Sequence, residues 1–152
     1  RVMPNTPMLA GKGVAALCKG SSATDKDIEK ASTMFAAAAE TVIVDEKEMD
    51  AVTAVSGSGP AYFYFLAEKM TEAGVAEGLT KETAARLAVE TLKGAAALID
   101  ITGEPPDALR KKVTSPGGTT EAALERMEKG NAGKGIVSAV RRAAERSREL
   151  SK

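Results

Sequence analysis

The chain has 152 residues, which is enough for one domain or for one domain with a fragment of another. Its 21 basic residues balance 21 acidic ones, so no net field favours nucleic acid or an anionic membrane. Apolar residues make up 43% and aromatic residues only 3%, and the many alanines favour closely packed helices over a sheet sandwich.

Histidine is absent and Cys18 is the single cysteine. This removes the commonest general base and leaves no Cys/His cluster for zinc, so no metal is expected. A lone cysteine cannot form an internal disulfide, and no apolar run approaches the ~20 residues that span a bilayer. The opening residues also lack the pattern of a signal peptide. We therefore expect a cytoplasmic protein with no membrane partner.

The first 45 residues predict a mixed α/β segment. Residues 2–7 are extended and stiffened by two prolines, which suggests a start inside a truncated domain. Strands are predicted from Gly13 to Cys18 and over residues 41–44. Between them, Thr24 caps a helix whose first turn is acidic. These strands are too few for a complete sheet.

From Glu46 onward the apolar spacing is helical. Helices are predicted over residues 46–55, 61–76, 80–103, 107–113, 119–129 and about 136–150. The second helix is apolar on every side from Ala61 to Ala67, so it must be buried all round, in a large core or a subunit interface. A helical unit of about 105 residues cannot cover these faces alone, which predicts an interlocked homodimer; a compact monomer is the alternative.

Residues 115–120, Ser-Pro-Gly-Gly-Thr-Thr, form the stretch most informative about chemistry. Proline fixes one dihedral, and the two glycines let the backbone bend and approach a ligand closely. The loop leads into a helix N-terminus, where unpaired N–H groups and the helix dipole attract a small carboxylate or a phosphate. An ordinary loop with a threonine cap is the alternative.

Residues 56–60, Ser-Gly-Ser-Gly-Pro, have the composition of a phosphate-binding loop. They follow a helix, so the strand-turn-helix context of a dinucleotide site is missing, and no other segment supplies it. A tight helix-to-helix corner is predicted, with Pro60 in a first helical turn. Residues 4–7, Pro-Asn-Thr-Pro, could lie beside a ligand at a strand end, with a plain turn as the alternative.

Three stretches together resemble the pyrroline-5-carboxylate reductase family in order and spacing, and the resemblance covers the whole chain: residues 1–7, 50–62 and 113–120. It implies a mainly α fold. Residues 46–152 would form an all-helical dimerisation and substrate-binding domain. A small α/β remnant of a Rossmann nucleotide-binding domain, residues 1–45, would precede it. The family reduces 1-pyrroline-5-carboxylate to L-proline with NADPH or NADH, at a site between the two domains and at the dimer interface.

The resemblance assigns roles within the Ser-Pro-Gly-Gly-Thr-Thr loop. The amides of Gly117, Gly118 and Thr119, together with Ser115, would cradle the substrate carboxylate. Thr120 would hydrogen-bond the ring nitrogen and act as the catalytic proton donor or relay.

Three further positions match the family outside that loop. Glu46 matches an acid near the substrate that could favour the charged iminium. Pro4 and Asn5 match the cofactor-binding segment beside the nicotinamide. Family members usually carry an amide side chain at the position of Lys112, so no contact is assigned to this lysine.

The implied partners are pyrroline-5-carboxylate, proline and a second copy of the chain in a homodimer, which could assemble further. The glycine fingerprint for the dinucleotide is not in these 152 residues, so the chain alone is expected to bind NADPH poorly and to reduce nothing. Two alternatives stay open. One is a stand-alone helical dimerisation module without catalysis, and the other is a related imine or β-hydroxyacid reductase with the same architecture.

Overall fold

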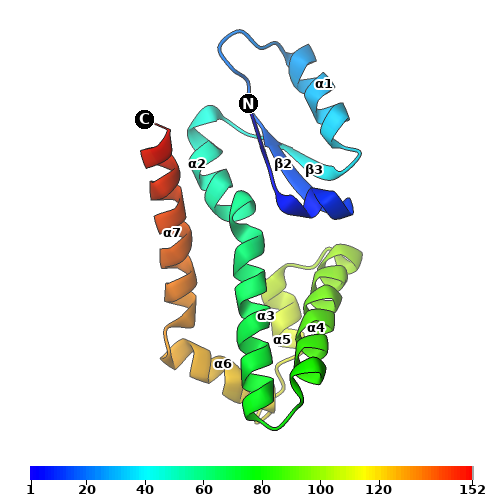
Figure 1. The fold of residues 1–152 in the computed structure, drawn as a ribbon, viewed down its shortest axis with the longest axis vertical. Helices are drawn as coiled ribbons and strands as arrows, with labels where there is room; N and C mark the ends of the chain where they lie inside the picture. The colour runs from blue at the N-terminus through cyan, green and yellow to red at the C-terminus, as the bar shows by residue number, and fades with distance from the viewer. Residues whose placement is uncertain (152) are drawn as a thin grey trace. The chain divides into compact units, whose positions relative to one another are not determined.

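The computed structural model describes residues 1–151 and confirms a mainly α fold with a small α/β region (Figure 1). In chain order the elements are β1 (Val2–Pro4), the 3-10 helix η1 (Thr6–Ala10), β2 (Gly13–Leu17), α1 (Asp25–Phe35), β3 (Ala39–Ile43), the 3-10 helix η2 (Glu46–Glu48), α2 (Met49–Val52), the π-helix η3 (Thr53–Gly57), α3 (Gly59–Ala76), α4 (Lys81–Thr102), α5 (Pro106–Lys112), α6 (Thr119–Lys129) and α7 (Ala132–Leu150).

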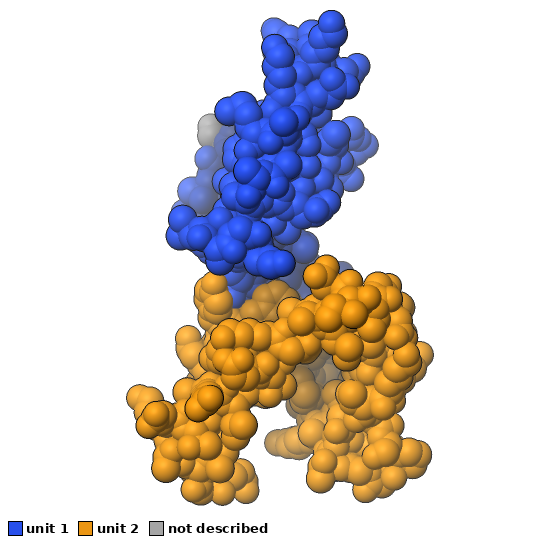
Figure 2. Space-filling view, turned by 90° about the vertical axis from the view of Figure 1, so that its right-hand side faces the viewer, with its two compact units in different colours: residues 1–62, 137–152 blue, residues 63–136 orange. Residues whose placement is uncertain are grey.

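The chain divides into two units, coloured separately in Figure 2. Unit 1 contains residues 1–62 together with the C-terminal segment from Val137, and unit 2 contains Phe63–Ile136. Helices α3 and α7 each begin in one unit and end in the other. A division at residues 45 and 46 stays a prediction.

Unit 1 holds a three-stranded sheet in the order β1-β2-β3. The central strand β2 is antiparallel to β1, with Ala16 opposite Met3, and parallel to β3, with Ala15 opposite Thr41. From Ala15 to Cys18 every side chain is buried, because neighbours cover both faces of the central strand. This strand is the centre of the core of unit 1.

Helix α1 supplies the crossover that a parallel strand pair requires, and lies along the sheet (Figure 1). Its predicted cap is confirmed, because Asp27 Oδ2 accepts hydrogen bonds from the Thr24 hydroxyl at 2.7 Å and the Thr24 amide at 2.9 Å. These bonds lower the pKa of Asp27. Ile28 is the buried residue of α1, and Ser32 Oγ of the same helix lies 2.7 Å from Thr41 Oγ1 of β3.

The sheet is open at both sides. Within residues 1–151, β1 and β3 each pair along one edge only. Val42 and Ile43 of β3 are exposed. Unpaired strand edges of this kind invite pairing with further strands.

The segment predicted as one helix followed by a corner is helical from Glu46 to Gly57, with changes of winding, and Ser58 forms a bend before α3. Ser58 N donates to Thr53 O at 2.8 Å, a bond across five residues that widens the turn into a π-helix. A Cβ on Gly57 would lie 3.4 Å from Met3 Sδ, so this glycine lets η3 pack closely against β1. Close packing by glycine was predicted, but the widened turn was not.

Helix α7 is tied to α2 within unit 1, where the two run side by side in Figure 1. Ser147 Oγ donates to Asp50 Oδ1 at 2.5 Å, although the two residues are 97 positions apart. The helix begins at Ala132, earlier than predicted, because Asn131 adopts a left-handed conformation with φ of 57° immediately before it.

Unit 2 has almost no core of its own in the single chain. Its buried apolar residues are Ala84 and Ala88, both on α4. Helices α3 and α4 approach closely at Gly74, where a Cβ would lie 3.0 Å from Ala84 Cβ. Small side chains therefore make the contact between these helices, and the large apolar side chains lie elsewhere.

Those large side chains are exposed. On the helix predicted to be buried all round, the exposed apolar residues are Phe63, Tyr64, Phe65, Leu66, Met70 and Val75. The chain exposes 11001 Å², whereas a compact chain of this length would expose roughly 7,300 Å². Within residues 1–151, no helix is both long and apolar enough to cross a membrane.

We predict that Gly13→Ala destabilises unit 1, because a Cβ there would lie 2.8 Å from the Met8 Cα and closer still to its side chain. The expected loss is about 1–3 kcal/mol in the free energy of unfolding, measured by urea denaturation. Gly20→Ala is the matched control, since nothing lies within 4 Å of its added Cβ. Equal unfolding midpoints for the two variants would contradict the close approach of Met8.

Candidate functional site

The Ser-Pro-Gly-Gly loop is a tight turn between α5 and α6. Gly118 N donates to Ser115 O at 3.0 Å, and Gly117 has φ of 71°. Proline at the second position and a left-handed glycine at the third are typical of a type II turn. A Cβ on Gly118 would lie 2.6 Å from Ser115 Oγ. Gly117 is therefore favoured by its left-handed backbone, and Gly118 by the close approach of Ser115.

The turn delivers two open amide donors at the start of α6. Gly118 is the cap residue, with extended dihedrals of −85° and 168°, and no side chain caps the helix there. No acceptor among residues 1–151 bonds the backbone amides of Thr119 or Thr120. Unpaired amides at the positive end of a helix dipole suit a small anion.

The other two amides of the motif are already engaged. The Gly118 amide closes the turn, and the Gly117 amide donates to Glu121 Oε2 at 2.7 Å. Both amides were predicted to be ligand donors, and the bond to Glu121 was not predicted. A carboxylate is thus bound to the motif in the single chain, and it belongs to the protein itself.

Thr120, the predicted proton donor, is half-buried at the second position of α6. Within residues 1–151 its hydroxyl makes no hydrogen bond, and neither does that of Ser115. The Thr119 hydroxyl likewise makes no hydrogen bond within residues 1–151, so the three hydroxyls of residues 115–120 are all uncommitted.

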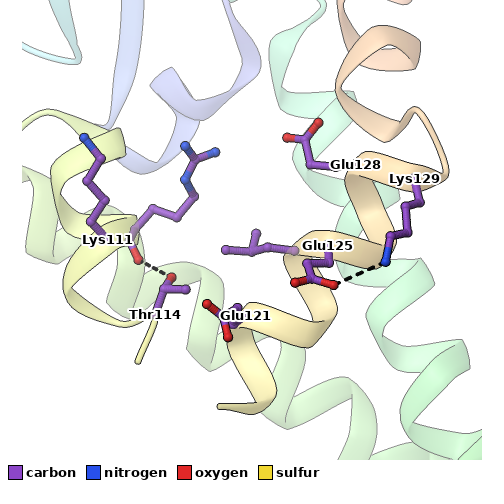
Figure 3. A pocket seen from close by; sticks show the side chains of 8 residues that line it. Lys111, Thr114, Glu121, Glu125, Glu128 and Lys129 are labelled. Atoms are coloured by element: carbon purple, nitrogen blue, oxygen red, sulfur yellow. Dashed lines mark hydrogen bonds and ion pairs between the residues drawn. The ribbon is translucent and has the colours of Figure 1, made fainter. Parts of the chain in front are cut away.

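An open groove of about 570 Å³ lies between α5 and α6 in unit 2. Glu121, Glu125 and Lys129 line its α6 side, and across the groove lie Thr114, just after α5, and Lys111, whose side chain is directed away from α6 (Figure 3). The full lining is Arg110, Lys111, Thr114, Glu121, Leu124, Glu125, Glu128 and Lys129. Glu121 therefore belongs both to the turn and to the wall of this groove.

Lys112 has a structural partner. Its Nζ lies 2.5 Å from Glu104 Oε2, so the pair joins the end of α5 to the connection that precedes it. The pair braces the helix that leads into the Ser115 turn. The sequence analysis assigned no role to this lysine, and the pair spans too many residues to be read from local spacing.

The remaining candidates belong to unit 1. Asn5 uses both ends of its amide inside the protein, since Nδ2 donates to Ser56 O at 3.1 Å and Oδ1 accepts from Val14 N at 2.9 Å. It ties the end of β1 to β2 and to η3. Pro4 ends β1 and is exposed. Asn5 is thus a brace within the fold.

Glu46 begins η2 and has two partners. Cys18 Sγ donates to its Oε2 at 3.0 Å, and its Oε1 pairs with Arg1. Beside it, at the carboxyl ends of β2 and β3, is a pocket of about 340 Å³ lined by Lys19, Ile43, Val44, Asp45, Glu46 and Glu48. Such strand ends are where open α/β sheets place ligands. The Cys18–Glu46 contact was not predicted.

The candidate residues therefore lie in both units. In unit 1 Asn5 lies at the start of β2 and Glu46 just past its end, so the two do not meet, whereas the turn of residues 115–120 is a compact group in unit 2. No group of side chains suited to a metal ion is present among residues 1–151.

Fold and turn together define a class of protein, in which a small α/β segment leads into a helical domain that carries a type II turn before an uncapped helix N-terminus. The model of the family described as pyrroline-5-carboxylate reductase dimerisation matches residues 46–150. The chain belongs to this family.

Relatives match across the whole chain. Pyrroline-5-carboxylate reductase of Arabidopsis thaliana is 45% identical over 151 residues, which cover 99% of this chain and 55% of the relative. That of Corynebacterium melassecola is 42% identical over 152 residues, which cover 100% of this chain and 56% of the relative. The chain thus spans about half the length of these curated relatives.

Solved structures agree with the fold. Pyrroline-5-carboxylate reductase of Coxiella burnetii has a TM-score of 0.94 and 38% identity, covering 100% of this chain and 57% of that one. The enzyme of Plasmodium falciparum with NADP bound has a TM-score of 0.91 and 34% identity, covering 99% of this chain and 62% of that one.

We predict that Asn5→Ala lowers the free energy of unfolding by about 1–3 kcal/mol, because it leaves the Val14 amide and the Ser56 carbonyl without partners. Thr6→Ala is the control, since Thr6 is exposed. Urea denaturation measures both. An Asn5→Ala chain as stable as the control would show that the brace contributes nothing.

Proposed function

We propose that this chain is the substrate-binding and dimerising part of an enzyme that reduces 1-pyrroline-5-carboxylate to L-proline with NADPH or NADH. Family membership and identity to named reductases over nearly the whole chain support this. The observation that carries the proposal is the pair of open amides behind the type II turn, at the start of α6.

The substrate of this reaction is a small ring that carries a carboxylate. Its carboxylate would be held by the open amides of Thr119 and Thr120 with the Ser115 hydroxyl, and by the Gly117 amide once that amide is released, while the Gly118 amide keeps the turn closed. The helix dipole adds to these bonds, and hydrogen bonds to a charged acceptor are roughly twice as strong as neutral ones. To bond the Gly117 amide, any such ligand must displace Glu121, whose carboxylate accepts a hydrogen bond from that amide.

The ring nitrogen must gain a proton for the imine to become an amine. Thr120, whose hydroxyl is uncommitted, would donate or relay that proton. Glu46 would favour the charged iminium, which accepts hydride more readily than a neutral imine. Its contacts with Arg1 and Cys18 fix the position of its carboxylate.

The residues of this chain do not by themselves fit a dinucleotide. Both ends of the Asn5 amide are used inside the protein, and no Gly-x-Gly-x-x-Gly follows a strand in the sequence. NADP is bound in the Plasmodium falciparum relative, of which this chain covers 62%. We therefore assign the cofactor mainly to segments of the enzyme outside these residues, with Pro4 and Asn5 beside the nicotinamide.

A homodimer accounts for the exposed apolar surface of unit 2. Its two buried alanines cannot stabilise a unit that leaves Phe63, Tyr64 and Phe65 in solvent. Cover by a second copy supplies the missing core.

We place the enzyme in the cytoplasm. Its one cysteine is a buried free thiol that donates to Glu46, and a reducing compartment preserves such a thiol.

The proposal predicts binding without turnover by this chain. L-proline should shift the backbone resonances of residues 115–120 in a nuclear magnetic resonance titration, because its carboxylate bonds the amides of the turn. Pyrrolidine, which has the ring without the carboxylate, should leave them unchanged. The same chain mixed with NADPH and pyrroline-5-carboxylate should consume no cofactor. Shifts confined to other segments, or steady NADPH consumption, would overturn this division of roles.

The homodimer predicts that Phe65→Glu gives a monomer, because a charge would be buried in the interface. Light scattering coupled to gel filtration should report twice the chain mass for the unmodified chain and a single mass for the variant. Glu29→Lys, on the exposed surface of α1, is the control and should stay dimeric. A monomeric unmodified chain would contradict the proposal.

A further inference from the structure

One contact in the turn has no place in the proposed function. Gly117 N, a donor assigned to the substrate carboxylate, already bonds Glu121 Oε2 at 2.7 Å. The group that occupies the donor is itself a carboxylate. The chain therefore places at its turn the same functional group that the substrate would place there.

We propose that Glu121 is an internal competitor that sets the affinity of the turn for carboxylate ligands. Without ligand it caps the Gly117 amide, and an incoming carboxylate displaces it. This inference rests on the proposed function, because it concerns the same turn.

The turn keeps its shape when Glu121 leaves. It is closed by the bond from Gly118 N to Ser115 O, and the left-handed glycine at position 117 sets its direction. Neither feature involves Glu121. Displacement thus exposes a third donor next to the open amides of Thr119 and Thr120 without rebuilding the backbone.

The displaced side chain has somewhere to go. Glu121 lies on the wall of the open groove between α5 and α6, whose lining also includes Arg110 and Lys111. These cations offer a counter-charge to the released carboxylate. The exchange therefore does not bury an unpaired charge, which would make it costly.

A purely structural role for Glu121 makes the opposite prediction. An acidic residue at the third position of a helix can stabilise the helix start by bonding an amide before it. If that were its whole role, removing the carboxylate would weaken the turn, and ligand affinity would fall or stay constant. Competition instead requires affinity to rise.

The experiment compares the unmodified chain with Glu121→Gln, Glu121→Ala and the matched control Glu125→Gln. Glu125 lines the same groove one turn along α6, and among residues 1–151 its one partner is Lys129, at 3.3 Å. L-proline is titrated into each chain, and the dissociation constant is taken from the amide shifts of residues 115–120. Pyrrolidine reports any shift that does not need a carboxylate.

Glu121→Ala should bind L-proline about five- to tenfold more tightly than the unmodified chain, which corresponds to the net contribution of one ordinary, exposed hydrogen bond no longer displaced. Glu121→Gln should lie between them, because its amide oxygen still accepts from Gly117 without a charge. Glu125→Gln should match the unmodified chain. Before ligand is added, the Gly117 amide resonance should move in both Glu121 variants and not in the control.

The outcomes separate the two proposals. Equal affinities in all four chains, with shifts in the turn, would remove the competitor and leave the proposed function intact. Equal gains in L-proline affinity for Glu121→Gln and Glu121→Ala would show that the negative charge of Glu121, and not its bond to the Gly117 amide, weakens binding. That result would also overturn the inference. No shift in the turn with any chain would remove the proposed function and the inference with it.

Discussion

The near absence of a core in unit 2 is the constraint on which the rest of the molecule depends. Burial of apolar surface is the dominant favourable term in folding, and net stability is a small difference between large terms. Unit 2 buries two alanines and leaves the aromatic residues of α3 in solvent. Its stability is therefore tied to whatever covers α3, and for a homodimer it depends on the concentration of the chain. The turn of residues 115–120 is carried by this unit, so its rigidity also depends on assembly.

Unit 1, unlike unit 2, has a buried core within the single chain. Its central strand is buried from Ala15 to Cys18, and long-range hydrogen bonds fix the surrounding elements, notably those of Asn5 and the Ser147–Asp50 pair. The centre is thus complete, while the sheet edges are open within residues 1–151. Side chains that look poised for chemistry, such as Asn5 and Glu46, are committed to holding this centre together. In this unit the candidate site residues Asn5 and Glu46 therefore form hydrogen bonds that also stabilise the fold.

What the sequence predicted well is what local chemistry decides. The bounds of α6, Thr119–Lys129, follow from the glycines on either side of it, and they were predicted as observed. The bend at Gly117 follows from the Ser-Pro-Gly-Gly pattern. The π-turn of η3 was missed, because no local sequence signal distinguishes the bond from Ser58 N to Thr53 O from ordinary helical bonding. The Cys18–Glu46 contact joins residues 28 positions apart and leaves no local signal. Glu121 could have been found, since an acid at the third position of a helix often reaches back to an amide.

Self-capping by Glu121 has a consequence for which ligands the turn accepts. A buried or half-buried amide without a partner is costly, so a turn with several open donors would bind any small anion. With the Gly117 amide already bonded, a ligand gains little by replacing one carboxylate with another. It must also bond the amides of Thr119 and Thr120, or reach the Thr120 hydroxyl with a second polar group. A ring that carries both a carboxylate and a nitrogen atom meets that requirement. A monocarboxylate without a second polar group can only replace the Glu121 carboxylate at the Gly117 amide. Competition by Glu121 for the Gly117 amide would thus make the turn selective for ligands that form a second polar contact.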